Sequence, residues 1–139
     1  MPLPFVDHLG ARIEQAKDGA SLISLVVQPQ HFNSSHVVHG GVLFSLADTG
    51  MGAALYPSLA PDETCTTVEI KISYFRPVTA GVIVCRSAVL HRGRRMAHLE
   101  SALMVDEAQV ARATGTFAIV ARKSPGTPGE ASASRTPGG

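Results

Sequence analysis

The chain of 139 residues contains no tryptophan, few charged residues and only two cysteines. Charged side chains make up 17% of the chain, whereas hydrophobic ones make up 45%. A lone monomer with so few charges would expose much apolar surface, so we expect another subunit to cover part of it. The formal net charge is only +1. Such a small charge creates no strong positive field, which argues against a nucleic-acid-binding function.

Signals for disulfides, export and membrane insertion are missing as well. Cys65 and Cys85 both lie in strand-like runs, at a spacing that indicates neither a disulfide nor a metal site, which favours a reduced, cytoplasmic setting. The first residues include prolines and an early Asp7, with no basic lead into an apolar run, so they do not read as a secretory signal. No stretch reaches the roughly 18 uninterrupted apolar residues of a membrane span. We therefore expect a cytoplasmic protein without a membrane partner.

The strongest pattern in the chain is a helical one that ends near Tyr56. From Leu43 onward, apolar or small residues recur at helical spacing, at Leu46, Ala47, Gly50, Met51 and Ala54. This spacing predicts a core helix with one buried stripe. Asp48 lies about 140° from Leu43 around such a helix, beside the stripe, at ~100° per residue. Aspartate is a poor residue for a helix interior, so Asp48 is either at the solvated edge of an amphipathic helix or kept there for its chemistry.

The start of this helix carries the sequence His39-Gly40-Gly41. The two glycines leave the first backbone N–H groups of the helix open to a ligand oxygen, at the positive end of the helix dipole. Amide donors at the start and a carboxylate two turns further in would suit attack on an acyl carbonyl. A pair of glycines before a helix is more often only a turn, so this combination is weak by itself.

The other segments favour strands. A short helical turn is expected at residues 4–9, followed by strands at 11–17, 21–28, 66–75, 82–90, 96–105 and 110–120, with a hairpin at Asp18-Gly19. Within residues 66–75, alternation predicts one face with Val68, Ile70, Ile72 and Tyr74, and another with Thr67, Glu69, Lys71 and Ser73.

Short turns between long strands predict an antiparallel meander and an α+β class. Residues 1–122 should form one domain, and residues 123–139, rich in Pro, Gly and Ser, a disordered tail.

Four motifs together give the chain a family resemblance: Asn33, His39-Gly40-Gly41, Leu46-Ala47-Asp48 and Tyr74-Phe75-Arg76-Pro77. In residues and spacing they resemble the hotdog-fold acyl-CoA thioesterases of the phenylacetate-pathway, or PaaI-like, type. The resemblance covers residues 4–122. It implies one long central helix wrapped by an antiparallel sheet of six or so strands. It also implies hydrolysis of an aryl, arylacetyl or short-to-medium-chain acyl-CoA to the free acid and coenzyme A, without cofactor or metal.

The resemblance also implies roles for individual residues. Asp48 would act as general base on water or as nucleophile, and the Gly40 amide would be the oxyanion donor. His39 and Asn33 would surround the thioester. Considered without the resemblance, His39 is equally typical of a helix start and Asn33 of a turn. Thr67 would hold the attacking water with its hydroxyl, unless its neighbour Thr66 takes that place. His36 departs from the family, which commonly has glycine there.

Substrate contacts are expected along the helix and at a basic turn. Gly41, Phe44 and Met51 would contact the substrate, and a tunnel shaped by Phe44, Met51, Leu55 and Tyr56 would select the acyl group. The basic turn is either a solvated hairpin tip or a site for the phosphates of coenzyme A, and its arginines are Arg92, Arg94 and Arg95. The side chains of His31, His36, His39 and Asp48 are of the types that bind zinc, but nothing in the resemblance requires a metal.

In the resembled family the active site lies between subunits, so a homodimer or homotetramer is expected. Asn33, His39 and Gly40 of one subunit would then face Asp48 of the other. The main alternative is a hotdog protein that binds acyl-CoA without turning it over, although a binder has little need for an unpaired carboxylate. A hotdog hydratase is a second alternative, but its catalytic arrangement has no match here.

Overall fold

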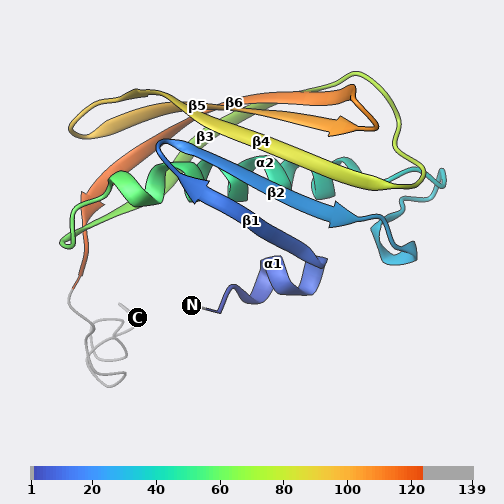
Figure 1. The fold of residues 1–139 in the computed structure, drawn as a ribbon, viewed down its shortest axis with the longest axis horizontal. Coiled ribbons are helices and arrows are strands. Elements are labelled where there is room, and N and C mark those ends of the chain that lie inside the picture. The colour runs from blue at the N-terminus through green and yellow to red at the C-terminus, as the bar shows by residue number, and fades with distance from the viewer. Residues whose placement is uncertain (1, 124–139) are drawn as a thin grey trace, which may run out of the picture.

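The computed structural model describes residues 2–123, which form one six-stranded sheet and one long helix (Figure 1). The strands are β1 (Ala11–Lys17), β2 (Ala20–Val26), β3 (Glu63–Tyr74), β4 (Val82–Arg92), β5 (Met96–Val105) and β6 (Ala108–Ala121). The helices are α1 (Pro4–Leu9) and α2 (Gly40–Leu55), with 3₁₀ turns at Pro29–His31 and Tyr56–Ser58. Apart from Lys123, the predicted tail at residues 123–139 lies outside the described residues. The expected α+β class and the hotdog architecture are confirmed.

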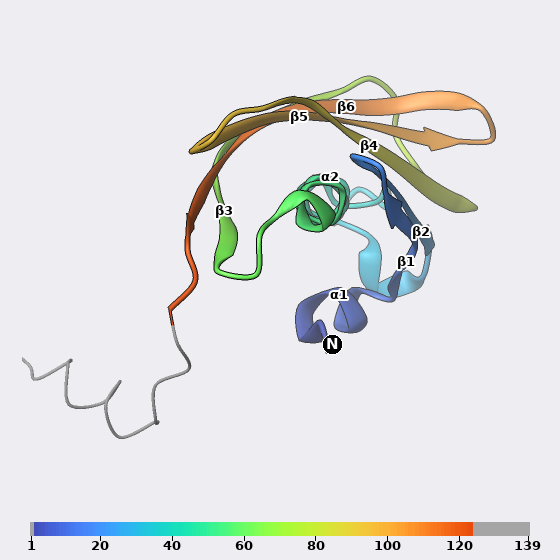
Figure 2. The same cartoon turned by 60° about the vertical axis from the view of Figure 1, so that its left-hand side comes forward.

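Helix α2 lies along the concave side of the curved sheet (Figure 2). The predicted stripe is confirmed, because the buried residues of α2 are Val42, Leu43, Leu46, Ala47, Gly50, Met51, Ala54 and Leu55. They pack against the inward-facing side chains of the sheet, such as Ile23, Ile83 and Leu99. The opposite side of α2 is not covered by the sheet, so any function of this helix must lie there.

The order of the strands is β1-β2-β4-β5-β6-β3, and β4, β5 and β6 form the predicted antiparallel meander. Strands β1 and β2 also follow one another in both sequence and space, as an antiparallel pair. Between β2 and β3 the chain runs through α2 across the concave face, so β3 begins at the far edge of the sheet and pairs with β6. As a result β2 pairs directly with β4. Strands β1 and β3 are left as the two edges.

A bulge in β3 corrects the predicted alternation of that strand. The register with β6 shifts between Thr67 and Glu69, so Val68 is an extra residue without a partner. This insertion reverses the side on which the following residues lie. Thr67 therefore faces α2 together with Ile70, although strict alternation had placed them on opposite faces. Val68 is 54% exposed rather than part of the buried face.

Buried hydroxyl groups tie the sheet to the middle of α2. Ser21 on β2 donates to the carbonyl of Gly50 over 2.6 Å, and Ser101 on β5 donates to the carbonyl of Ala47 over 3.1 Å. The hydroxyls of Ser87 on β4 and Ser101 lie 2.6 Å apart, and since Ser101 already donates to Ala47, Ser87 is the donor between them. We call Ser21, Ser87 and Ser101 the serine cluster.

Cys85 and Gly50 also contribute to the contact between the sheet and the middle of α2. The Cys85 thiol donates to the carbonyl of Leu46 over 3.5 Å, and burial raises the pKa of this thiol, which keeps its proton available. A Cβ at Gly50 would lie 2.3 Å from the Ser87 hydroxyl, so only glycine allows the helix to approach the serine cluster this closely. The position of α2 over the sheet is thus set by directional hydrogen bonds as well as by apolar packing.

Replacing Ser101 with alanine should lower the free energy of unfolding by about 1–3 kcal/mol, because the buried Ser87 hydroxyl loses its acceptor. Urea denaturation followed by circular dichroism measures this. Ser45→Ala is the matched control, since the Ser45 hydroxyl bonds the Gly41 carbonyl on the uncovered side of the same helix and should change stability by less than about 0.5 kcal/mol. Equal losses in the two variants would contradict a special role for the serine cluster.

Candidate active site

Asp48 lies in the middle of α2, half-buried at the edge of the side that the sheet leaves uncovered. Its Oδ1 accepts a hydrogen bond of 2.8 Å from the Thr67 hydroxyl on β3. The bulge after Thr67 turns this hydroxyl towards the helix. The structure therefore brings Asp48 and Thr67 together, and it is Thr67 rather than its neighbour Thr66 that reaches the carboxylate. Oδ2 has no hydrogen-bond donor among residues 2–123.

Cys65 is a further neighbour of Asp48 that sequence reasoning placed in a strand but not in the site. It precedes Thr67 by two residues on β3 and is free and partly buried. Burial raises the pKa of its thiol, and the negative charge of Asp48 raises it further. Cys65 therefore stays a neutral thiol beside the carboxylate and is a poor nucleophile.

The start of α2 holds the second part of the candidate site. His39 is the N-cap residue, and its Nδ1 accepts a 2.8 Å hydrogen bond from the Gly41 amide. The amide of Val42 donates to the His39 carbonyl over 2.9 Å. The Gly40 amide, in contrast, finds no acceptor within residues 2–123. Gly40 thus has an open N–H at the positive end of the helix.

Tyr74 supports this helix start from the end of β3. Its hydroxyl donates to the Gly40 carbonyl over 2.8 Å, and a Cβ at Gly40 would lie only 3.0 Å from that hydroxyl. Burial raises the pKa of Tyr74, so the hydroxyl keeps the proton that it donates. Sequence reasoning placed Tyr74 on one face of a strand and in a strand-end motif, but not at the helix start. Since 34 residues separate it from Gly40, no local spacing could have revealed this contact.

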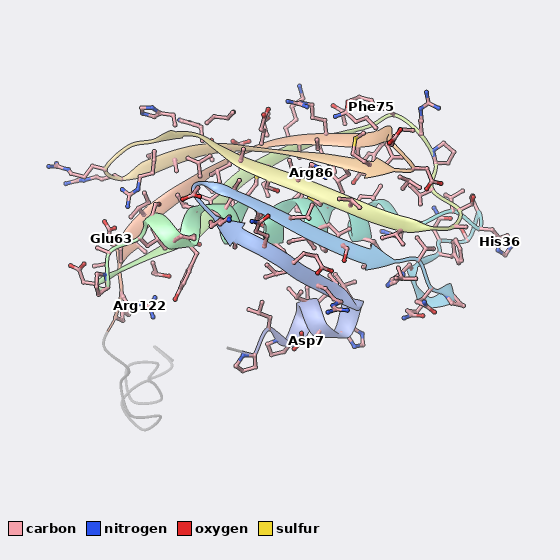
Figure 3. The ribbon with its side chains drawn as sticks, viewed as in Figure 1. Asp7, His36, Glu63, Phe75, Arg86 and Arg122 are labelled. Atoms are coloured by element: carbon pink, nitrogen blue, oxygen red, sulfur yellow. The ribbon has the colours of Figure 1, made fainter. Side chains whose placement is uncertain are left out.

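The loop before the helix is organised by Asn33. Its side-chain oxygen accepts hydrogen bonds from the amides of Ser35 at 2.9 Å and Val37 at 3.3 Å. The contacts within residues 2–123 are therefore those of a turn-forming asparagine. His36 adopts φ of 61°, a left-handed conformation that glycine accommodates most easily, and its side chain lies at the outer end of the loop (Figure 3). This backbone explains why the resembled family commonly has glycine there.

The arginines at the β4–β5 turn differ in their contacts. Arg92 donates to the Glu63 carboxylate at 2.9 Å and to the carbonyls of Gly93 and Ser58 at 2.8 and 3.2 Å, so its guanidinium is already engaged. The pKa of Glu63 is lowered by the Ala60 amide and, to a smaller extent, by Arg92. Arg94 and Arg95 are exposed and form no ion pair with any residue from 2 to 123.

The residues expected to contact substrate along α2 divide into two groups. Gly41 is exposed and Phe44 is 37% exposed, both on the uncovered side that also carries Asp48. Met51 and Leu55 are 0% exposed and belong to the core. Their side chains cannot line a tunnel for the acyl group, which corrects that expectation. Tyr56, at 52% exposure, remains accessible.

No group of three His, Cys, Asp or Glu side chains within residues 2–123 is placed to hold a metal ion. His31 is buried and both of its ring nitrogens are engaged, since Nδ1 accepts from the Gln28 amide at 2.9 Å and Nε2 donates to the Leu9 carbonyl at 2.7 Å. It therefore ties α1 to the loop and is not free to bind a ligand. No helix in the described part of the chain is long and apolar enough to cross a membrane.

Comparison with known proteins identifies the family of the chain. Residues 35–120 match the family model described as the thioesterase superfamily. The acyl-coenzyme A thioesterase PaaI of Escherichia coli is 32% identical over 90 residues, which cover 63% of this chain and 61% of PaaI. A relative from Archaeoglobus fulgidus that carries a provisional esterase name is 34% identical over 73 residues, 52% of this chain and 46% of the relative. The matches thus span about half to three-fifths of the length of these curated relatives.

Among solved structures, the conserved protein PA5202 from Pseudomonas aeruginosa superimposes with a TM-score of 0.83 at 35% identity, covering 86% of this chain and 96% of PA5202. The matched family model spans more than half of the chain and includes the helix start, Asp48 and Thr67. The fold, the motifs and the similarity to PaaI agree with one another. The chain therefore belongs to the thioesterase superfamily and has a hotdog fold of the PaaI-like type.

Proposed function

We propose that the protein is an acyl-CoA thioesterase that hydrolyses aryl, arylacetyl or short-to-medium-chain acyl-CoA thioesters, with Asp48 as the reactive carboxylate. The observation that carries this proposal is the pairing of Asp48 with Thr67 on the uncovered side of α2. A protein that only binds acyl-CoA has no need of an oriented carboxylate there. The membership of the thioesterase superfamily supports the same chemistry.

Thr67 leaves Asp48 with one oxygen occupied and one available. With Oδ1 held by the Thr67 hydroxyl, Oδ2 can accept a proton from water, whose oxygen then attacks the thioester carbonyl. The C–S bond breaks, the carboxylic acid is released, and the proton passes to the departing thiolate of coenzyme A. In the nucleophilic alternative Oδ2 attacks the carbonyl itself, the C–S bond breaks with release of the coenzyme A thiolate, and water later hydrolyses the resulting anhydride to the acid and the free carboxylate. Both routes need an ionised carboxylate in the position that Thr67 fixes.

Gly40 and His39 are the proposed partners of the carbonyl oxygen. An amide fixed at a helix start stabilises the negative charge that develops in the transition state more than it stabilises the substrate. Since Nδ1 of His39 accepts from Gly41, a neutral His39 carries its proton on Nε2 and can donate a further hydrogen bond. Asn33 contributes through the loop that presents His39. These groups prepare one oxyanion site at the start of α2.

Asp48 and Gly40 of one chain are too far apart to act on one carbonyl. Gly40 begins α2 and Asp48 follows eight residues later. At about 1.5 Å per residue the two lie about 12 Å apart along the axis, whereas both must lie within about 3 Å of the reacting atoms. We therefore propose a homodimer, or a tetramer made of two such dimers, in which Gly40 of one subunit faces Asp48 of its partner. The exposed Phe44 and Val68 beside the site and on the β3 edge suit such an interface.

For coenzyme A itself we propose contacts with the basic turn. Arg94 and Arg95 are exposed and suit the phosphates, since guanidinium groups form paired hydrogen bonds to phosphate oxygens. Arg92 is engaged with Glu63 and Ser58, so we assign it to holding the turn in place. Gly41 at the helix start and Phe44, about one turn before Asp48, lie on the uncovered side of α2 and would contact the thioester arm.

Asp48→Asn should keep the fold and acyl-CoA binding but lower turnover on the order of 100-fold or more, because the amide cannot take a proton from water. Release of free thiol from aryl- and alkyl-CoA substrates measures turnover, and calorimetry measures binding. Asp7→Asn is the matched control, because Asp7 is exposed on α1 (Figure 3) and should leave the rate unchanged. Wild-type binding without thiol release from any substrate would favour the non-catalytic alternative.

Gly40→Pro should lower kcat on the order of 100-fold relative to Gly40→Ala, because proline removes the N–H while alanine keeps it. Both variants add a Cβ near the Tyr74 hydroxyl, so the steric cost is shared. Proline is well tolerated at the first position of a helix, and His39 before it already has ψ of 134°. Steady-state rates on one acyl-CoA test the pair, and equal rates for proline and alanine would remove the Gly40 amide from the mechanism.

A further inference from the structure

Two hydrogen bonds at the start of α2 share one peptide group. The Tyr74 hydroxyl donates to the Gly40 carbonyl over 2.8 Å, and the Gly41 amide donates to Nδ1 of His39 over 2.8 Å. The Gly40 carbonyl and the Gly41 N–H belong to the same planar, conjugated peptide group. A continuous chain of hydrogen bonds therefore runs from a hydroxyl on β3, through one peptide group, to the imidazole ring at the N-cap of the helix.

A hydrogen bond at one end of a peptide group affects the other end. A donor on the carbonyl oxygen draws electron density away from the nitrogen, which makes the N–H a stronger donor. In a chain of hydrogen bonds this effect strengthens each bond by about 10–30%. The Tyr74 hydroxyl therefore holds the peptide group in place and also strengthens the bond from Gly41 to His39.

This chain acts on the tautomer of His39. Nδ1 can accept from the Gly41 amide only while Nδ1 carries no proton, so the proton of the neutral ring is on Nε2. In the other tautomer two N–H groups would point at each other, and the ring would have to turn away. His39 is exposed, and its Nε2 has no hydrogen-bond partner within residues 2–123. The Nε2 proton is thus available to an oxygen of the substrate.

The surrounding structure fixes the parts of this chain. The His39 amide donates to the His31 carbonyl over 2.8 Å, which holds the backbone of the N-cap residue. A Cβ at Gly41 would lie 2.9 Å from Nδ1 of His39, so a larger residue there would push the ring away from the amide. Partial burial raises the pKa of Tyr74, so its hydroxyl keeps the proton that it donates. Each part therefore has the identity and the position that the chain requires.

We propose that Tyr74 is a positioning residue, which holds His39 in the tautomer that donates from Nε2. It acts through the peptide group between Gly40 and Gly41. The proposal rests on the thioesterase function argued above, because the Nε2 proton stabilises a thioester oxygen only when negative charge develops on it. Strand β3 then orients two groups of the mechanism, since it also carries Thr67, which binds Asp48.

Tyr74→Phe tests the link to His39 without an activity measurement. Nitrogen NMR of protein that contains isotope-labelled histidine distinguishes the two tautomers of a neutral ring, and His39→Ala identifies the signals of His39. At alkaline pH, where histidine is neutral, we expect the Nε2–H form in the wild type and a mixture of both tautomers in Tyr74→Phe. An unchanged tautomer in Tyr74→Phe would overturn the proposal.

Ser45→Ala is the matched control for this measurement. The Ser45 hydroxyl donates to the Gly41 carbonyl over 2.8 Å, so the substitution also removes a hydroxyl from a carbonyl in the first turn of α2. The N–H of that peptide group belongs to Val42 and donates to the backbone of His39, not to its ring. Ser45→Ala should therefore leave the His39 tautomer unchanged, and a shift equal to that in Tyr74→Phe would contradict the route through the Gly40 carbonyl.

Steady-state kinetics test the same link by a double-mutant cycle. Tyr74→Phe should lower kcat on the order of 10-fold, about the contribution of one hydrogen bond, and change KM little. The same substitution should have almost no effect on kcat when His39 is already alanine, because Tyr74 acts through His39. An equal loss in both backgrounds would show a merely structural role and overturn the proposal. Absence of thiol release by the wild type, together with the tautomer shift in Tyr74→Phe, would instead overturn the proposed function and leave the link from Tyr74 to His39 in place.

Discussion

The contact between the serine cluster and the middle of α2 is the constraint on which the rest of the structure depends. Apolar packing attracts the helix to the sheet, but such contacts are non-directional and allow a helix to slide. The bonds from Ser21 and Ser101 to the carbonyls of Gly50 and Ala47 are directional, and they lie on both sides of Asp48 in sequence. They therefore fix the carboxylate along the helix axis, where a misplacement of about 1 Å can cost on the order of 100-fold in rate.

The two sides of α2 differ: one side packs against the sheet, and the other carries Asp48. One side carries the buried stripe and the carbonyls that accept from the sheet. The other side carries Asp48 and, about one turn before it, the exposed Phe44. At the helix start, the Gly40 amide has no acceptor within residues 2–123, while Tyr74 donates to the Gly40 carbonyl. In the proposed mechanism a single element thus presents the reactive carboxylate and the oxyanion donor, spaced so that two subunits are needed to combine them.

Features with a local signature could be predicted from the sequence. The 3.6-residue pattern predicted the buried stripe of α2, Asp18-Gly19 predicted the first hairpin, and the motif around Asp48 predicted the family. The resemblance assigned Thr67 to holding the attacking water, but its hydrogen bond to Asp48 was not predicted, because the bulge at Val68 reverses the alternation and bulges have no reliable sequence signal. The position of β3 beside β6 was not predictable either, since it depends on the path of α2 across the sheet. Met51 was assigned to the substrate because helical periodicity alone does not separate residues that face a core from those that line a ligand pocket.

The most direct test of this account is complementation between two inactive variants, Asp48→Asn and Gly40→Pro. Each homodimer lacks one essential group at both of its sites. If Gly40 of one subunit serves Asp48 of its partner, a mixed dimer contains one site with both groups intact. Unfolding and refolding an equal mixture should then restore about a quarter of wild-type thiol release, because half of the dimers are mixed and each has one intact site of two. A refolded mixture no more active than the separate variants would contradict the shared site.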